Sequence, residues 1–379
     1  MKVGINFHTV DEYISGVDRY ALGLLNALLR VDTQNQYLVY TNQPDLVSRQ
    51  VAQSKNLKIA GIKHLKRRIA RILWEHTQLP RLAEKHRLDL LHCLSYICPL
   101  RRASVPYVVT VHDTIAIDHP QWCKKTNALY FRLVMKATVQ RASCVVSLSN
   151  CTADDLKRNF RLPSSKIRTI YPGTDNIFNQ RSDSRRRAEV RMRYRLPERY
   201  ILYVGNIEPK KNIGTLLRVQ RRIREMGLAH KLVVVGKRSW RAQAELAEMD
   251  RDVASGNVVP AGYVERKDLP LVYNMADVFV FPSLYEGFGF PPLEAMASGT
   301  PVVSSSMGAL AETVNDAALI VEPCDVQQIA EAVASLIADP SLREKHVRKG
   351  LQQSRLFDWE KTAGETLSVY REVVEAHGR

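Results

Sequence analysis

Two carboxylates in one short segment are the first candidates for chemistry in this sequence. Glu286 and Glu294 flank the glycine- and proline-rich stretch "GFGFPPL". Carboxylate oxygens accept hydrogen bonds from sugar hydroxyls, and Gly287 and Gly289 let a ligand approach the backbone closely. The spacing therefore suits a ligand that carries two separate groups of hydroxyls, such as the sugar and the ribose of a sugar nucleotide.

The segment around these acids predicts a strand, a loop and a helix. An apolar run, "ADVFVFPS", precedes it, and Pro292 is expected to open a helix that Gly299 closes. Loops that leave parallel strands and enter helices bind ligands in open α/β sheets, because helix N-termini attract anions. Glu294 is expected in the first helical turn, where a structural role at the helix dipole is the alternative.

A second candidate segment, "YILYVGNIEPKKNIGTLL", brings two cations to a helix start. The run passes from a strand through Gly205 into a helix that is expected to begin near Lys210 and Lys211. Lysines at a helix N-terminus oppose the helix dipole, so they cost stability unless an anion lies between them. A diphosphate would supply that anion, and two solvated lysines remain the alternative.

The first half of the chain offers two weaker candidates. Gly16 precedes an amphipathic helix, which again directs a helix N-terminus toward a possible phosphate, although simple turn chemistry explains a lone glycine equally well. His112 and Asp113 end the buried run "VVTVHD". A histidine at a strand end can bind a ligand near neutral pH or make a structural hydrogen bond.

Strand-like apolar runs alternate with amphipathic helical stretches along the whole chain of 379 residues. This alternation and this length predict an α/β protein with two doubly wound, Rossmann-like parallel-sheet domains. A Pro-Gly turn places the hinge at residues 172–175. The expected domains are 1–172 and 173–360, with a terminal helix at 361–379 that returns to the first domain.

The charge balance is the unusual feature of the composition. Lys and Arg total 55 against 39 Asp and Glu, a net charge of +16 that attracts polyanions. The stretch Ile62–Trp74 has the pattern of a basic amphipathic helix, which can lie on an anionic membrane or pack on its own domain. The arginine-rich stretch Arg181–Tyr200 is read as a solvated helix or linker.

Other classes of site and location are not expected. The start is too polar for a signal peptide and no run is long enough to span a membrane, so a cytoplasmic protein is expected. The cysteines lack metal-ligand spacing and are read as reduced thiols. Asp250 and Asp252 form the one DxD motif, but both fall in a helical run, where residues two apart point to different sides. No metal site is expected.

The segment "EGFGFPPLE" resembles the E-x7-E signature of the retaining family 4 glycosyltransferases. The resemblance extends over most of the chain through "SGVDRY", "VHD", "IYPGTD" and "LYVGNIEPKKN". It implies the GT-B architecture, in which two Rossmann-like domains face each other across the active cleft. It also implies transfer without a metal ion or other cofactor.

The resemblance assigns roles to residues of this chain. Lys211 is similar to the lysine that binds the donor diphosphate, and Glu294 to the acid that holds the ribose. The resemblance further implies that Gly16 contacts the distal phosphate and that His112 contacts the sugar near the reacting centre. Glu286 and the backbone of Gly287, Phe288 and Gly289 would contact the transferred sugar. The backbone of Gly262–Val264 would contact the nucleobase. Asn206 stands where many members carry an arginine, and Lys210 is expected to supply part of that charge.

The implied reaction is retaining transfer of a hexose, with Lys211 stabilising the departing diphosphate. No carboxylate is a convincing nucleophile, so attack on the same face, with the leaving phosphate accepting the proton, is expected. GDP-mannose is the leading donor, and UDP- or dTDP-sugars are alternatives. A sugar-nucleotide epimerase and a polyanion-binding protein without enzymatic activity are further alternatives.

Bacterial relatives with a similar segment "EGFGFPPLEAMA" often resemble mannosyl- or rhamnosyltransferases that build surface polysaccharide, such as O-antigen, on a polyprenyl diphosphate carrier. A polyprenyl-diphosphate-linked saccharide is therefore the expected acceptor, in lipopolysaccharide biosynthesis. The protein is expected to be peripheral on the inner face of the cytoplasmic membrane, where the basic stretch would meet anionic lipid. No nucleic-acid recognition motif is present, so no specific nucleic-acid partner is expected.

Overall fold

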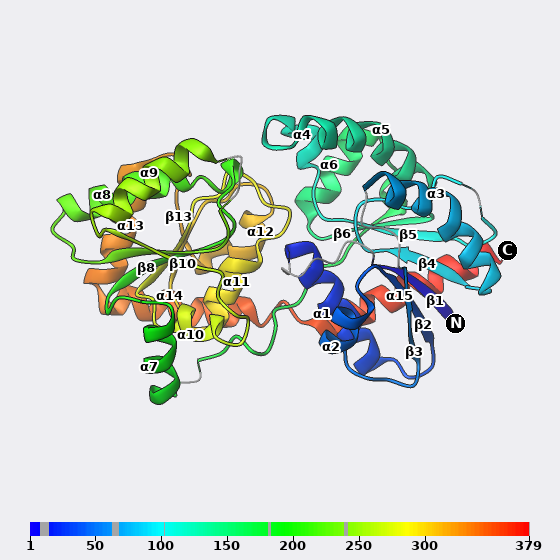
Figure 1. The fold of residues 1–379 in the computed structure, drawn as a ribbon, viewed down its shortest axis with the longest axis horizontal. Coiled ribbons are helices and arrows are strands. Elements are labelled where there is room, and N and C mark those ends of the chain that lie inside the picture. The colour runs from blue at the N-terminus through cyan, green and yellow to red at the C-terminus, as the bar shows by residue number, and fades with distance from the viewer. Residues whose placement is uncertain (8–14, 63–67, 102, 181–182, 239–241, 379) are drawn as a thin grey trace. The chain divides into compact units, whose positions relative to one another are not determined.

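The structure is a computed structural model that describes residues 1–7, 15–62, 68–101, 103–180, 183–238 and 242–378. The chain forms two compact units (Figure 1). Unit 1 comprises Met1–Gly173 and Asp358–Arg379, and unit 2 comprises Thr174–Phe357. The chain thus passes between units inside the segment 172–175 that the Pro-Gly turn marks.

Unit 1 is built on a seven-stranded parallel sheet with the strand order β3-β2-β1-β4-β5-β6-β7. Its strands are β1 (Lys2–Asn6), β2 (Gln36–Thr41), β3 (Leu57–Gly61), β4 (Leu90–Cys93), β5 (Tyr107–Val111), β6 (Cys144–Ser147) and β7 (Ile167–Thr169). Its α-helices are α1 (Gly16–Val31), α2 (Pro44–Gln50), α3 (Arg68–Lys85), α4 (Ile115–Asp118), α5 (Lys125–Arg141), α6 (Asn150–Phe160) and α15 (Trp359–His377). Short 3-10 turns cover Pro120–Trp122 and Ser164–Lys166.

Unit 2 is built on a six-stranded parallel sheet with the order β10-β9-β8-β11-β12-β13. Its strands are β8 (Tyr200–Val204), β9 (Lys231–Val235), β10 (Val258–Gly262), β11 (Val278–Phe281), β12 (Val302–Ser304) and β13 (Leu319–Ile320). Its α-helices are α7 (Ser184–Arg193), α8 (Ile213–Glu225), α9 (Gln243–Ala254), α10 (Leu269–Asn274), α11 (Phe290–Ala297), α12 (Leu310–Val314), α13 (Val326–Ala338) and α14 (Pro340–Ser354). The 3-10 turns are Pro209–Lys211 and Asn315–Ala317.

The strand orders confirm the predicted fold class of two doubly wound parallel sheets. The central strands are almost completely buried and apolar, as expected for strands covered by helices on both faces. In each sheet the strand order reverses once, between β1 and β4 in unit 1 and between β8 and β11 in unit 2. Such switch points are where doubly wound sheets bind ligands, beyond the carboxyl ends of the strands.

The terminal helix α15 packs against α1 within unit 1. A side chain at Gly23 of α1 would lie 2.2 Å from the indole of Trp359, the first residue of α15. Only glycine therefore allows the indole of Trp359 to pack so closely on α1.

Two local expectations were wrong, and one strand, β3, was not predicted, because it is a half-exposed edge strand without a long apolar run. Helix α11 begins at Phe290 after Gly289, which places Glu294 beyond the first turn. Lys210 and Lys211 lie in a 3-10 turn, and α8 begins only at Ile213, because Asn212 adopts a left-handed conformation that interrupts the helix.

The predicted amphipathic helix at Ile62–Trp74 is described from Arg68 onward, where α3 begins. Residues 63–67, which carry most of its basic side chains, lie outside the described residues. Within the described part of the chain no helix is both long and apolar enough to cross a membrane.

Candidate functional site

The candidate site in unit 2 forms where β8 and β11 pair at the switch point of the sheet. The two strands are parallel, with Ile201 opposite Val278, so the loops that follow them leave the same edge. The first loop, residues 205–212, contains the two lysines, and the second, residues 282–289, contains Glu286. The topology thus brings together two segments about 75 residues apart in sequence.

Lys211 and Glu286 form a nearly buried ion pair. The lysine Nζ lies 2.5 Å from Oε1 of Glu286, and the two side chains are 14% and 9% exposed. Ser283 Oγ donates a second hydrogen bond to the same oxygen at 2.7 Å. The Lys211 ammonium also lies 5.1 Å from the centre of the Phe281 ring. The anion that the lysine pair requires is, in this structure, Glu286.

Burial and charge act against each other on this pair. Burial alone would raise the pKa of Glu286, but the positive charges of Lys211 and Lys210 outweigh it and hold that pKa below its ordinary value. Burial lowers the pKa of Lys211, although Glu286 opposes the shift. Glu286 is therefore a carboxylate at neutral pH, held where it can accept hydrogen bonds.

Asn212 joins residues 205–212, which we call the lysine loop, to two neighbouring loops. Its backbone is left-handed, with φ +57°, and its amide nitrogen donates to the carbonyls of Pro282 at 3.1 Å and Pro323 at 2.6 Å. The carbonyl of Lys210 accepts a hydrogen bond from the Leu284 amide at 2.8 Å, and its oxygen also lies 3.1 Å from Ser283 Oγ. Three loops are therefore joined around Lys211, and neither Asn212 nor Ser283 was predicted as part of the site.

The backbone of Glu286 is held from the other side by the loop after β12. Glu286 forms a parallel bridge with Gly308, and its carbonyl accepts from the Ala309 amide at 2.9 Å. Gly308 has φ +64°, and a side chain there would lie 2.5 Å from the Glu286 carbonyl oxygen. Glycine is thus required for this close approach, which fixes the orientation of the acid.

The glycines beside Glu286 lead into α11. Gly289 has φ +105° and caps the helix, and the Phe288 ring is buried against Phe290 and Phe357. The Phe288 side chain thus belongs to the core, and the expected contact of its backbone with the transferred sugar stays a prediction. The Phe288 carbonyl already accepts from Thr313 Oγ1.

Glu294 lies deeper in unit 2, only 3% exposed. The hydroxyl of Tyr273 in α10 donates to Glu294 Oε2 at 3.0 Å, and Tyr273 itself is fully buried. The hydrogen bond fixes one carboxylate oxygen of Glu294. Tyr273 was not predicted, because 21 residues separate it from Glu294 and no local pattern joins them.

The remaining predicted residues of unit 2 lie at neighbouring strand ends. Asn206 is exposed after β8, and its side-chain oxygen accepts from the Lys237 amide at 3.4 Å. Lys210 is half-buried in the lysine loop, and Val264 is buried just after β10. Asp250 and Asp252, which were rejected as metal ligands, pair with different arginines, Arg238 and Arg221.

Unit 1 holds His112 in a defined orientation at the end of β5. Its Nε2 lies 2.8 Å from the Leu94 carbonyl oxygen. A carbonyl can only accept, so Nε2 carries the hydrogen, and Nδ1 is the acceptor of the neutral ring. Burial lowers the pKa of His112, which favours that neutral form. The ring also packs edge-on against Tyr20.

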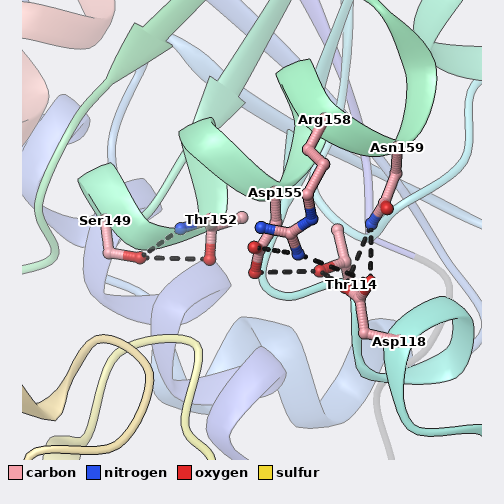
Figure 2. A network of polar contacts seen from close by, with 7 residues as sticks. All are labelled: Thr114, Asp118, Ser149, Thr152, Asp155, Arg158 and Asn159. Atoms are coloured by element: carbon pink, nitrogen blue, oxygen red, sulfur yellow. Dashed lines mark hydrogen bonds and ion pairs between the residues drawn. The ribbon is translucent and has the colours of Figure 1, made fainter.

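A polar network fastens the loop after His112 to α6 (Figure 2). Thr114 Oγ1 donates to Asp118 at 2.6 Å and lies 3.2 Å from a carboxylate oxygen of Asp155, and Arg158 pairs with Asp155 at 2.5 Å. Asn159 donates to both oxygens of Asp118. Asp155, Arg158 and Asn159 all belong to α6, so the network holds the segment from Thr114 to Asp118 against this one helix.

Gly16 is the first residue of α1, directly after the N-cap Ser15. Ser15 and Asp18 form a capping box, in which the Asp18 carboxylate accepts from the Ser15 amide at 2.8 Å. Gly16 is exposed, and a side chain there would meet nothing within 4 Å. Residues 8–14, which precede this turn, lie outside the described residues.

Comparison with known proteins assigns the chain to a family. Residues 187–353 match the profile of the glycosyl transferases group 1, and residues 14–176 match that of Glycosyltransferase Family 4. The O-antigen chain mannosyltransferase B of Escherichia coli is 32% identical over 266 residues, which cover 70% of each chain.

Solved structures show the same fold over nearly the full length. The sucrose-phosphate synthase of Thermosynechococcus elongatus has a TM-score of 0.78 at 24% identity, with 99% of each chain covered. Anabaena HepE, solved in complex with UDP-glucose, has a TM-score of 0.75 at 17% identity, covering 97% of this chain and 100% of its own. This chain therefore belongs to the family 4 glycosyltransferases of the GT-B fold and is similar to bacterial mannosyltransferases.

Proposed function

We propose that this glycosyltransferase moves mannose from GDP-mannose to a lipid-linked or oligosaccharide acceptor in surface polysaccharide biosynthesis, with retention of configuration. The similarity to an O-antigen chain mannosyltransferase supports the choice of sugar and pathway class. The observation that carries the proposal is the Lys211–Glu286 pair, which sets a buried cation and a buried carboxylate side by side at the switch point of unit 2.

The donor's nucleotide would be held by groups of unit 2. Lys211, with the added charge of Lys210, would bind the diphosphate. Glu294, oriented by the hydrogen bond from Tyr273, would accept hydrogen bonds from the ribose hydroxyls. The backbone at Val264 would contact the base, and Asn206 would supply a neutral contact where many relatives carry an arginine.

The transferred sugar would be held by Glu286 and by the backbone of Gly287, Phe288 and Gly289. Because the Glu286 carboxylate is ionised and fixed by Ser283, it can accept hydrogen bonds from sugar hydroxyls without reorganisation. Nδ1 of His112 would accept from a sugar hydroxyl near the reacting carbon. The turn at Gly16 would meet the distal phosphate.

The reaction would exchange one bond for another at the anomeric carbon. The bond between this carbon and the diphosphate oxygen breaks, and a bond to the acceptor hydroxyl oxygen forms on the same face. The acceptor proton passes to the leaving phosphate oxygen, so no protein nucleophile is needed. Lys211 would stabilise the negative charge that develops on the diphosphate, in the place of a metal ion.

The acceptor would be a polyprenyl-diphosphate-linked saccharide, and the protein would act peripherally on the inner face of the cytoplasmic membrane. The net charge of +16 supports attraction to anionic lipid rather than to a specific nucleic acid, for which the sequence carries no recognition motif.

The test is transfer to a polyprenyl-diphosphate-linked acceptor from a panel of GDP-, UDP- and dTDP-sugars in the presence of EDTA. The proposal requires a mannosylated product whose new linkage is α, the configuration of the donor. Transfer from a UDP-sugar alone would favour the alternative that the UDP-glucose complex of HepE suggests. An altered free sugar nucleotide, with the acceptor unchanged, would instead identify an epimerase.

A further inference from the structure

Helix α5 of unit 1 exposes two leucines one turn apart. Leu129 is 60% exposed and Leu133 is 67% exposed, although the opposite side of the helix buries Met135 and Val139 in the core. Residues four apart share one face of a helix, so the two leucines form a continuous apolar stripe. Exposed leucines are unremarkable singly, but adjacent ones mark a contact surface.

Two further exposed leucines belong to the same side of the sheet. Leu73 of α3 is 59% exposed, and Leu100, in the segment after β4, is 38% exposed. Helices α3 and α5 bury residues in one shared core cluster, so they cover the same sheet face. The intervening segment touches both helices, because the Leu100 amide donates to His76 in α3 and Cys98 donates to the Thr138 carbonyl in α5. We call Leu73, Leu100, Leu129 and Leu133, with Arg132 and Lys136, the α3–α5 face.

The charges of the α3–α5 face are of one sign. Arg132 and Lys136 are exposed on the same stripe of α5 as the two leucines. Helix α5 carries no aspartate or glutamate. Of the two acids of α3, Glu75 is buried, and Glu84 is exposed near the end of the helix remote from Leu73, where it accepts a hydrogen bond from the Ser104 amide. Asp113 and Asp118, which precede α5 in the sequence, are hydrogen-bonded to Tyr96, Thr114 and Asn159.

We infer that the α3–α5 face docks on an anionic phospholipid bilayer. An apolar stripe bordered by arginine and lysine on one helix is the pattern of an interfacial helix, whose leucines enter the acyl boundary while the cations meet lipid phosphates. The central part of a protein–protein interface is instead rich in aromatic residues and poor in lysine. A polynucleotide would pair with the cations and leave the leucines in water.

This inference deepens the proposed membrane association, on which it rests, and it identifies the surface that makes the contact. The sequence pattern predicted a membrane-binding helix at Ile62–Trp74, whereas the exposed leucines among the described residues of unit 1 lie on α5, on α3 and in the segment after β4. The bilayer contact is therefore assigned chiefly to α5, with Leu73 at its border.

The experiment measures cosedimentation of the full chain with phosphatidylcholine vesicles, with and without phosphatidylglycerol. The expected result is binding that requires phosphatidylglycerol and weakens as salt is added. The variant L129S/L133S should bind at least about tenfold more weakly, since two partly exposed leucines no longer leave water on docking. The variant R132Q/K136Q should lose about 30-fold, because each cation near an anionic surface contributes roughly a factor of five.

The matched control is Leu356→Ser in unit 2, which removes a leucine of similar exposure, 65%, from another surface. It should bind vesicles as the wild type does. Thermal unfolding of each variant shows whether the fold is intact. Because all three sites are exposed, unfolding temperatures should stay within a few degrees of the wild type.

Other outcomes overturn the inference. Unchanged vesicle binding by L129S/L133S would exclude this face, and binding that needs no phosphatidylglycerol would exclude the role of the cations. A wild-type dimer that the leucine substitutions dissociate, without an effect on vesicles, would make the face a self-association surface. Binding to a polynucleotide but not to vesicles would assign the charge to nucleic acid.

Transfer from GDP-mannose to a water-soluble oligosaccharide acceptor, measured in the same preparations, separates this inference from the proposed function. Normal transfer without vesicle binding would overturn the docking face and leave the proposed function intact. Vesicle binding that depends on the leucines, without transfer from any donor, would overturn the proposed function and leave the docking face intact.

Discussion

The Nζ of Lys211 and Oε1 of Glu286 lie 2.5 Å apart, and both side chains are nearly withdrawn from water. The two residues come from loops that follow β8 and β11, the strands on either side of the switch point. Removing one member of a buried ion pair leaves the other charge without compensation, which costs about 3 kcal/mol. Breaking the pair should therefore destabilise unit 2 through the charge left unpaired, whereas removing both charges should spare stability and still abolish the proposed chemistry.

The first prediction concerns the single and double variants of this pair. Lys211→Met should lower the free energy of unfolding by about 3 kcal/mol and lower kcat at least about 100-fold, because Glu286 loses its partner and the diphosphate its cation. K211M/E286Q, which removes both charges, should recover most of the stability but none of the transfer. Denaturant unfolding and initial rates measure the two effects.

Two results would count against this account of the pair. Equal stability of the single and double variants would show that the pair does not hold the two loops. Unchanged transfer by Glu286→Gln alone would exclude the assignment of Glu286 to the transferred sugar.

The second prediction concerns the amide of Asn212. Asn212→Gly keeps a backbone that tolerates φ +57° and removes the two hydrogen bonds to Pro282 and Pro323, which should cost about 1–3 kcal/mol. Asn212→Ala should cost about 1 kcal/mol more, because alanine resists the left-handed conformation. Both variants should lower kcat by loosening the loop that carries Lys211. If the glycine variant transferred as fast as the wild type, the amide would have no part in positioning Lys211.

The third prediction concerns Tyr273 and its hydrogen bond to Glu294. Tyr273→Phe removes only the hydroxyl, so it should raise KM for the donor about three- to tenfold and change kcat little. The matched control is Tyr200→Phe, which removes a buried hydroxyl that donates to the Val272 carbonyl and does not touch Glu294. Equal effects of the two variants on KM would show a general effect on stability in place of a specific one on Glu294.

The fourth prediction concerns the pH dependence of stability and is independent of function. Burial raises the pKa of Glu75 from 4.5 to about 8, while Arg71 and a hydrogen bond from Asn6 oppose the shift. Because the folded value lies above the unfolded one, the contribution of Glu75 to stability is complete below pH 4.5 and is lost as the pH rises to about 8. The loss amounts to about 4–5 kcal/mol.

Glu75→Gln cannot ionise, and its side-chain oxygen can still accept from Asn6. Its free energy of unfolding should therefore decline less than that of the wild type between pH 4.5 and 8. Unfolding measured across this range in both proteins provides the test. Parallel curves would show that Glu75 is not the titrating group.

Much of the fold followed from the sequence because apolar strands alternate with helices in a regular way. The expected doubly wound sheets were confirmed. Strand β3 was not predicted, because an edge strand needs no long apolar run. The helix start before Glu294 was misplaced by two residues, since both Pro291 and Pro292 are compatible with a first turn.

The candidate site was only partly predictable. Lys211 and Glu286 were both expected to bind a donor, but their mutual contact depends on strand order, which the sequence does not state. Asn212 carried a readable signal, since asparagine tolerates the left-handed conformation that ends a short turn. Tyr273 carried none, because its contact with Glu294 arises only when α10 packs on α11. The ligand-binding roles of all the predicted site residues, from Gly16 and His112 in unit 1 to Lys211, Glu286 and Glu294 in unit 2, stay predictions.

The measurement that tests the central claim most directly is the thermal stability of the purified protein with GDP, UDP and dTDP and their sugars, alongside Glu294→Ala. A ligand at about 100 times its Kd should stabilise the fold by roughly 2.7 kcal/mol. The account predicts a shift with GDP and GDP-mannose that is lost in the variant. A shift with GDP-mannose that the variant retains would contradict the ribose assignment, and no shift with any nucleotide would contradict a donor site in unit 2.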